Sequence, residues 1–158
     1  MRAEAGYPDL VYKGLISEPL IAVLPSDHRL ASREEISPLD LVGETFIGMA
    51  DQAPVLRSLT EDYFRRSGID VKPAHRVEYL SMAMSIVAST RGVVLLPNYA
   101  RNFLTWSVVS RPLKGEVPTV DLVLGYHKAN SSPLLRLLLS RAEEMISRVP
   151  NPRVKGAT

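Results

Sequence analysis

The spacing of apolar positions along the chain predicts short strands separated by helices. The first apolar segment, Leu10–Leu24, ends in the unbroken run LIAVL, which is typical of a strand covered on both faces, as in a parallel sheet. Pro19 interrupts this segment, and because proline donates no backbone hydrogen bond, we expect it at a strand start or an edge. Five further strands are predicted at Glu44–Met49, Ala74–Leu80, Val93–Pro97, Trp106–Leu113 and Val120–Lys128.

Three helices are predicted between and after these strands. Apolar side chains recur at helical spacing in Ala53–Ser67, in Leu80–Ser89 and in Ser132–Arg148. Gly68 is expected to end the first of these helices and Arg91-Gly92 the second. Strands that alternate with helices of about 10–15 residues favour parallel pairing and an α/β fold.

The composition is that of a packed globular protein with one domain or two small lobes, since 46% of the 158 residues are hydrophobic and 23% are charged. The formal net charge is only +2 and like charges form no long run, so we expect no binding to nucleic acid by this polypeptide alone. The absence of cysteine excludes disulfides, thiolate catalysis and cysteine-ligated zinc. The apolar runs are too short to span a membrane and the N-terminus lacks a secretory signal, so a cytoplasmic location is expected.

One polar cluster, Asp27-His28-Arg29, could be catalytic or could end a connector between two lobes. A carboxylate next to a histidine in an extended chain points away from it, so Asp27 is poorly placed to orient the His28 ring. The cluster is therefore interpreted as a solvated turn after a buried strand. Replacing His28 by Ala is then expected to change the folding free energy by no more than about 0.5 kcal/mol.

Sequence patterns of known catalytic sites are missing. The three histidines, His28, His75 and His127, lie far apart and lack the paired spacing of a metal site. The chain contains no G-x-S-x-G elbow, no phosphate-binding G-x-x-x-x-G-K-[ST] loop and no G-x-G-x-x-G fingerprint. The sequence therefore predicts no enzymatic activity, no metal site and no cofactor.

Two strand-to-helix turns are better candidates for a binding site. One leads from Glu44–Met49 into the helix near Ala53, and the other leads into the helix near Leu80. In an open parallel sheet, ligands gather at the carboxyl ends of the strands, where free N–H groups and the helix dipole favour anions. The alternative is that both are ordinary turns, capped by Asp51 and Ser81. The residues alone leave these two interpretations open.

Several ordered motifs resemble those of the LysR-type transcriptional regulators. E-P-L and V-L-P in one strand, a polar H-R-L-A segment and the L-D-L and E-T-F-I segments follow one another as in that family. VASTRGVVLLPNYA resembles the family's A-x-G-x-G segment, with Ser89 or Thr90 in place of the first glycine. The similarity extends over roughly Leu10–Val149. The matching motifs stand at Glu18–Leu20, Val23–Pro25, His28–Ala31, Leu39–Leu41, Glu44–Ile47 and Val87–Ala100.

The resemblance implies an α/β fold, a two-lobed effector domain like the periplasmic binding proteins. It also implies that the winged helix-turn-helix and most of the first lobe are missing from this chain. The remainder would be a complete second lobe with the crossover strands and terminal helix of the first. The expected ranges are 1–24 for an N-terminal segment with the first crossover strand, 25–118 for lobe II, 119–149 for the return strand and terminal helix, and 150–158 for a loop or disordered tail.

The function implied by the resemblance is control of transcription by a small metabolite, often a carboxylate, bound between the lobes. We expect Phe46 rather than Phe103 to contact this effector. The effector-binding residues implied by position in the family are Thr45, Phe46, Ile47, Asp51, Leu80 and Ser81.

The resemblance also implies partners. The chain would pair with itself as a homodimer or tetramer, for which the apolar helices at Val55–Phe64 and Leu134–Met145 are candidates. It would meet DNA only through an N-terminal domain that this chain lacks, and no membrane is involved. The alternative function is a stand-alone or solute-binding small-molecule-binding protein of the same architecture, and the missing secretory signal argues against the extracytoplasmic form.

Overall fold

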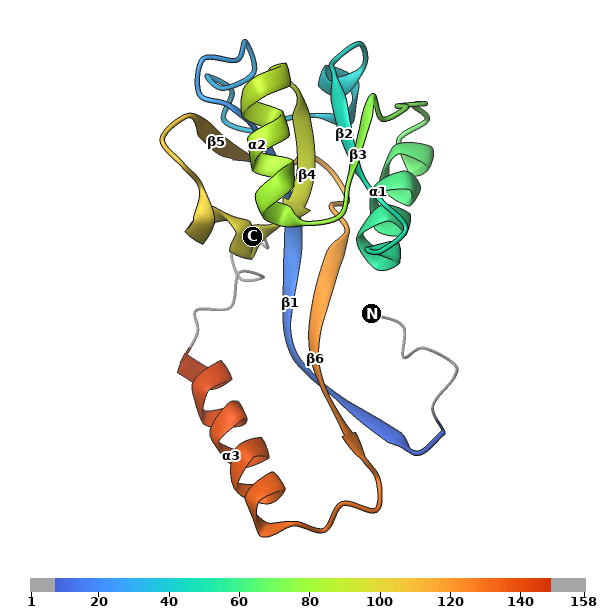
Figure 1. The fold of residues 1–158 in the computed structure, drawn as a ribbon, viewed down its shortest axis with the longest axis vertical. Helices are drawn as coiled ribbons and strands as arrows, with labels where there is room; N and C mark the ends of the chain where they lie inside the picture. Colours follow the sequence, from blue (N-terminus) through green and yellow to red (C-terminus); the bar gives the residue numbers. More distant parts are fainter. Residues whose placement is uncertain (1–7, 149–158) are drawn as a thin grey trace. The chain divides into compact units, whose positions relative to one another are not determined.

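The computed structural model describes residues 8–148 of the chain, which divides into two compact units (Figure 1). The large unit is Pro19–Val120, and the small unit combines the segments before and after it. β1 (Leu10–Pro25) and β6 (Thr119–His127) pair with each other, and each carries the chain from one unit into the other. The other elements are η1 (Pro38–Leu41), β2 (Phe46–Met49), α1 (Pro54–Arg66), β3 (His75–Val77), α2 (Leu80–Thr90), β4 (Val93–Pro97), η2 (Asn98–Phe103), β5 (Val108–Pro112) and α3 (Pro133–Arg148).

The large unit is built on five strands in the order β3-β2-β4-β1-β5. β2 is parallel to β3 and β4, so these three strands end at the same edge of the sheet. β1 runs antiparallel to both of its neighbours, with Val23 opposite Val94 of β4 and Ser110 of β5. Because Leu20 lies opposite Pro97, β1 enters the sheet at the edge where β4 ends.

The helices α1 and α2 cover opposite faces of this sheet. The ring of Phe46 in β2 meets Phe64 of α1 edge to face, with centroids 5.0 Å apart. The next residue, Ile47, lies against Gly92 just beyond the end of α2. Successive side chains of a strand point to opposite faces, so one helix packs on each side. Figure 1 shows α2 lying along β4 and α1 on the side of β2.

A buried phenol ties α1 to the far side of the large unit. The hydroxyl of Tyr63 donates to the carbonyl oxygen of Lys114 at 3.0 Å, and the Tyr63 residue is 2% exposed. Burial raises the pKa of Tyr63 to about 12. The phenol therefore remains a hydrogen-bond donor across the neutral pH range.

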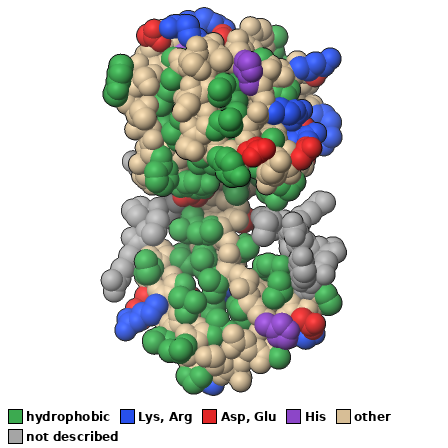
Figure 2. All heavy atoms as spheres, in the orientation of Figure 1, with side chains coloured by type: hydrophobic (Ala, Val, Ile, Leu, Met, Phe, Trp, Pro, Cys, Tyr) green, Lys and Arg blue, Asp and Glu red, His purple; other side chains and the backbone are tan. Residues whose placement is uncertain are grey.

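The hydrophobic core lies in the large unit, and the small unit has none in its described part. Every buried hydrophobic residue among residues 8–148 lies between Leu20 and Leu113, in the large unit. Within the small unit, an ion pair between Lys13 of β1 and Glu143 of α3 joins the strand to the helix. Figure 2 shows hydrophobic side chains spread over the surface of this unit. On α3, the large hydrophobic residues that are more than half exposed are Leu134, Leu137, Leu138 and Met145.

The order of strands and helices predicted from the sequence is confirmed, including the helix ends at Gly68 and Arg91, which both have positive φ. The expectation that LIAVL belongs to a parallel pair is wrong. Burial on both faces explains an apolar run, but it does not fix strand direction, and this strand is antiparallel on both sides. The ranges 1–24, 25–118 and 119–149 stay a prediction, and the tail at 150–158 lies outside the described residues.

The interpretation of Asp27-His28-Arg29 as a solvated turn is wrong for its histidine. His28 is 9% exposed, its Nδ1 accepts the N–H of Leu30 at 3.2 Å, and its Nε2 lies 3.1 Å from Oε2 of Glu44. The Nε of Arg29 donates to the other oxygen of the same carboxylate at 2.6 Å. Glu44, the partner of His28, stands 16 residues away in the sequence, so the residues next to His28 could not indicate this contact.

The neighbouring Asp27 is engaged elsewhere. Its carboxylate accepts a hydrogen bond from Nη1 of Arg91 at 2.7 Å, which lowers the pKa of Asp27. Arg91 stands at the C-terminal end of α2 in the left-handed conformation, with φ 58°. The pair thus ties the end of α2 to the end of β1 and leaves Asp27 no orienting role toward His28.

Replacing His28 by Ala should lower the free energy of unfolding by about 1–3 kcal/mol, because it leaves the buried N–H of Leu30 without an acceptor and removes one partner of Glu44. Urea unfolding measures this change. His75→Ala is the matched control, since His75 is exposed in β3, and it should stay within about 0.5 kcal/mol. Equal effects of the two substitutions would restore the solvated interpretation.

Gly92 allows the end of α2 to approach β2 closely. A Cβ added at Gly92 would lie 2.6 Å from the carbonyl oxygen of Thr45 and 2.9 Å from Cδ1 of Ile47. That carbonyl also accepts the N–H of Val93 at 2.8 Å, which begins the β2–β4 pairing. A side chain at position 92 would therefore push apart two backbones that must meet.

Gly92→Ala should destabilise the chain by about 1–3 kcal/mol through this overpacking. Gly14→Ala in β1 is the control, because a Cβ there meets nothing within 4 Å. Thermal unfolding followed by circular dichroism compares the two variants. A similar melting temperature for both would show that β2 and β4 adjust without cost.

Candidate functional site

The parallel strands of the large unit place three chain turns at one edge of the sheet. β2 ends at Met49, and the N–H of Ala50 donates to the carbonyl of Val77 at the end of β3, at 2.8 Å. β4 ends at Pro97 and continues directly into η2. The chain therefore enters α1, α2 and η2 from the same edge, where backbone groups of parallel sheets commonly meet ligands.

α2 begins without a side-chain cap. Tyr79 occupies the N-cap position in an extended conformation and makes no capping hydrogen bond. Ser81 lies inside the first turn, where its carbonyl oxygen accepts the Ser85 hydroxyl at 3.2 Å. The alternative in which Ser81 caps this helix is therefore wrong, because the helix begins at Leu80, two residues earlier than such a cap requires. Uncapped N–H groups and the positive end of the helix dipole favour an anionic group at this position.

α1 also begins without a side-chain cap. Its N-cap is Ala53, with Pro54 in the first turn, so Asp51 does not cap it as the alternative interpretation supposed. Asp51 instead forms an ion pair with Arg57, which also binds Glu61 through Nε at 2.9 Å. The hydrogen bond and charge of Glu61, followed by those of Asp51, raise the pKa of Arg57. The acidic side chain at this turn is thus partly neutralised.

A hollow of about 590 Å³, here called the α2 hollow, opens along one side of α2. Leu80, Ser81, Met84, Ser85 and Ala88 line it from the helix, and Phe103, Thr105 and Ser107 line it from η2 and the loop that follows. The lining contains no Asp, Glu, Lys or Arg. The hydroxyls of Thr105 and Ser107 form a hydrogen bond with each other at 3.0 Å. This arrangement suits a small ligand with an apolar body and a few polar groups.

The residues expected from the sequence to bind an effector do not all come together. Leu80 and Ser81 line the α2 hollow, and Asp51 lies in the exposed turn before α1. Thr45 precedes β2 at the opposite, amino end of that strand. Phe46 and Ile47 are 3% and 0% exposed and pack in the core. The predicted set of six therefore remains a prediction, with its support concentrated at the start of α2.

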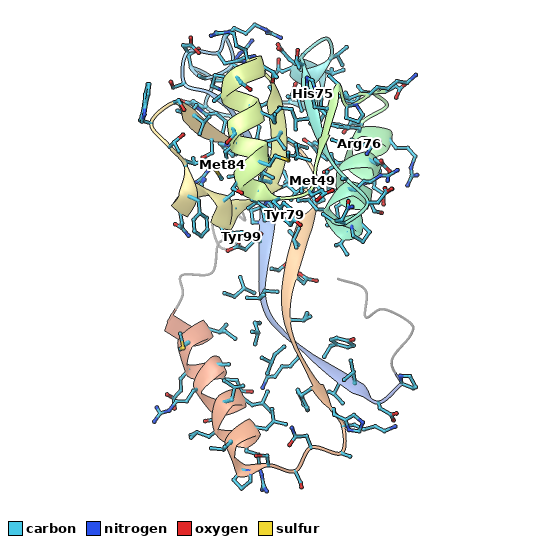
Figure 3. All side chains as sticks on the ribbon, viewed as in Figure 1. Met49, His75, Arg76, Tyr79, Met84 and Tyr99 are labelled. Carbon is cyan, nitrogen blue, oxygen red and sulfur yellow. The ribbon has the colours of Figure 1, made fainter. Side chains whose placement is uncertain are left out.

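Sequence reasoning missed several side chains at this edge. Figure 3 shows Met49, Tyr79 and Tyr99 at the end of the large unit where β2, β3 and β4 finish. Tyr79 is 65% exposed and Tyr99 42% exposed. Nη1 of Arg76 donates to the carbonyl of Met49 at 3.1 Å, which places a guanidinium at the end of β2. Tyr79 directly precedes Leu80 in the sequence, so the predicted strand-to-helix boundary could have identified Tyr79 as a residue of this edge.

Other kinds of site find no support within residues 8–148. No group of three or more His, Cys, Asp or Glu side chains there could hold a metal ion. None of the helices in this part of the chain is both long and apolar enough to cross a membrane.

Comparison with known proteins gives a consistent result. The family model described as the LysR substrate binding domain matches residues 1–146. The Hca operon transcriptional activator HcaR of Escherichia coli K12 is 30% identical over 154 residues, which are 94% of this chain and 51% of HcaR. The chain thus spans about half the length of this curated relative.

Solved structures show the same fold. HinK, a LysR family transcriptional regulator from Pseudomonas aeruginosa, superposes with a TM-score of 0.80 at 21% identity, over 92% of this chain and 51% of HinK. The effector binding domain of BenM with its effector benzoate gives a TM-score of 0.79 at 15% identity, over 96% of this chain and 71% of that one. The predicted α/β class of a two-lobed effector domain is confirmed by these likenesses.

Proposed function

Because the chain belongs to the LysR substrate-binding domain family, we propose that it is the effector-sensing part of a bacterial transcriptional regulator. Its curated relatives are transcriptional regulators and not enzymes. The ligand proposed for it is a small organic anion with an apolar body, such as a carboxylate metabolite. The observation that carries this assignment is the uncapped start of α2 beside the neutral, mostly apolar α2 hollow.

The chemistry of this hollow favours that class of ligand. Leu80, Met84 and Phe103 offer apolar surface, and the first N–H groups of α2 favour a negative group at one end. A benzoate molecule, which BenM binds as its effector, combines an apolar ring with one carboxylate. The ion pair of Asp51 with Arg57 weakens the repulsion that the Asp51 carboxylate would exert on such a ligand.

The proposed site residues carry unequal support. Leu80 and Ser81 would contact the ligand directly, whereas Thr45, Phe46, Ile47 and Asp51 stay predicted from position in the family. Burial of Phe46 against Phe64 means that its replacement would remove core packing first. Phe103, which is 65% exposed in the α2 hollow, is therefore the better probe of binding, contrary to the expectation from the sequence.

Regulation would follow from differential binding. A ligand that binds one arrangement of the protein more tightly than another shifts the populations of the two, and a ligand that binds both equally shifts nothing. We propose that this shift is transmitted through a homodimer or tetramer to an N-terminal DNA-binding domain of the full-length regulator, in the cytoplasm. The alternative, a stand-alone small-molecule-binding protein of the same architecture, shares the site but has no DNA-binding output.

The proposal can be tested by titrating the ¹⁵N-labelled chain with a panel of aromatic and aliphatic monocarboxylates that includes benzoate. Saturable shifts of the backbone amides at Leu80–Ala83 and Phe103–Ser107 are expected, and Phe103→Ala should weaken binding about fivefold or more. Trp106→Ala is the matched control, because Trp106 is 93% exposed nearby but does not line the hollow; it should change affinity less than twofold. Shifts that avoid α2, or equal effects of the two substitutions, would contradict the proposed site.

A further inference from the structure

A second hollow, here called the β5 hollow, lies at the β5 edge of the large unit; it is open to solvent and has a volume of about 610 Å³. The segment after β1 runs along this edge, since the N–H of Ile36 donates to the carbonyl of Pro112 and the N–H of Lys114 donates to that of Ile36, both at 2.9 Å. This pairing brings parts of the chain that are distant in sequence to one place. The polar lining consists of Ser32, Arg33, Glu34, Arg101, Ser110 and Arg111.

This lining contains three arginines, Arg33, Arg101 and Arg111, and one carboxylate, that of Glu34. Arg111 is half-buried, and its guanidinium is fixed by the carbonyl oxygen of Ser110 at 2.7 Å and by that of Ala31, without a carboxylate partner in the described chain. Arg33 and Arg101 are exposed, and their side chains make no hydrogen bond or ion pair within residues 8–148. Glu34 forms no ion pair in the same range.

This pattern differs from that of most other arginines in residues 8–148, although Arg76 and Arg136 also donate only to carbonyl oxygens. Six of them pair with carboxylates: Arg29 with Glu44, Arg57 with Asp51, Arg65 with Asp62, Arg66 with Glu116, Arg91 with Asp27 and Arg141 with Glu144. In the β5 hollow, Arg33 acts electrostatically on Asp40, whose pKa is lowered mainly by the N–H of Ser37 and only secondarily by Arg33. That carboxylate already accepts the Ser37 N–H at 2.9 Å. Because the lining holds three arginines and one carboxylate, the hollow carries a net positive charge.

We propose that the β5 hollow binds a small oxyanion with at least two negative charges, either a phosphate or a dicarboxylate. Guanidinium groups offer paired N–H donors that match the oxygens of both groups. Water and salt screen the charges of an open site, so a single ion pair would contribute little binding free energy. A ligand must therefore engage several guanidiniums together. Arg111, already held in position by two carbonyls, would supply the fixed contact, and Arg33 and Arg101 would close on the ligand.

This site is independent of the proposed effector site. No residue lines both the β5 hollow and the α2 hollow. The two ligands also differ in kind, because one hollow is neutral and mostly apolar and the other is polar and basic. A regulator with both sites would respond to two chemically distinct metabolites.

The test uses the ¹⁵N-labelled full chain at constant ionic strength, titrated separately with inorganic pyrophosphate and with citrate. Saturable shifts are expected for the backbone amides of Ser32–Glu34 and Ser110–Arg111 with at least one of the two probes. Binding by pyrophosphate alone assigns the site to phosphates, binding by citrate alone assigns it to carboxylates, and binding by both assigns it to multivalent oxyanions. Shifts that rise linearly without saturation with both probes would overturn the proposal.

Substitutions separate a built site from general attraction of charge. The double variant Arg33→Gln/Arg101→Gln should weaken binding at least tenfold, and Glu34→Gln should strengthen it. The control variant Arg65→Gln/Arg141→Gln loses the same charge at two exposed arginines outside the hollow and should change affinity less than twofold. Equal weakening by both double variants would overturn the site, whatever the outcome of the monocarboxylate titration at α2.

Discussion

The structure depends on the burial of β1 on both faces between Leu20 and Pro25. The four large aliphatic side chains of this run, at Leu20, Ile21, Val23 and Leu24, are at most 2% exposed. Burying them is worth roughly 6–12 kcal/mol, which is comparable with the net stability of a whole domain. Because β1 lies between β4 and β5, the part of β1 from Leu20 to Pro25, here called its inner half, joins the two sides of the sheet on which α1 and α2 pack.

The same strand relates the fold to the proposed function. β1 enters the sheet at the edge where β4 ends, opposite Pro97, and the neighbouring turns deliver the uncapped start of α2 and the exposed Tyr79 to that edge. The small unit has no buried hydrophobic residue in its described part, so the large unit provides the rigid frame. The proposed sensing surface would then lie on the well-packed unit, where its geometry is kept, and the small unit, with few buried apolar contacts, would open locally at lower free-energy cost.

The sequence was sufficient for the order of strands and helices, because most of these elements have a strong local pattern. Local patterns in the sequence indicate these elements: the LIAVL run, the helical spacing in α1 and α3, and the glycine after α1. The family motifs identify the architecture. Strand direction was not predictable from burial, and the environment of His28 depends on Glu44, which is distant in sequence. For the site, Leu80 and Ser81 follow from the strand-to-helix boundary. The burial of Phe46 and the exposure of Phe103 arise from packing that no local pattern records.

Native-state hydrogen exchange of the complete chain tests most directly the claim that stability resides in the large unit around the inner half of β1. The account predicts that amides at Ile21–Leu24 and Val94–Leu96 exchange only through global unfolding. Amides of the outer half of β1, at Val11–Ser17, and of α3 should exchange about 100-fold faster or more through local opening. Equal protection along the whole of β1 would contradict this account, because the two halves would then unfold as one unit.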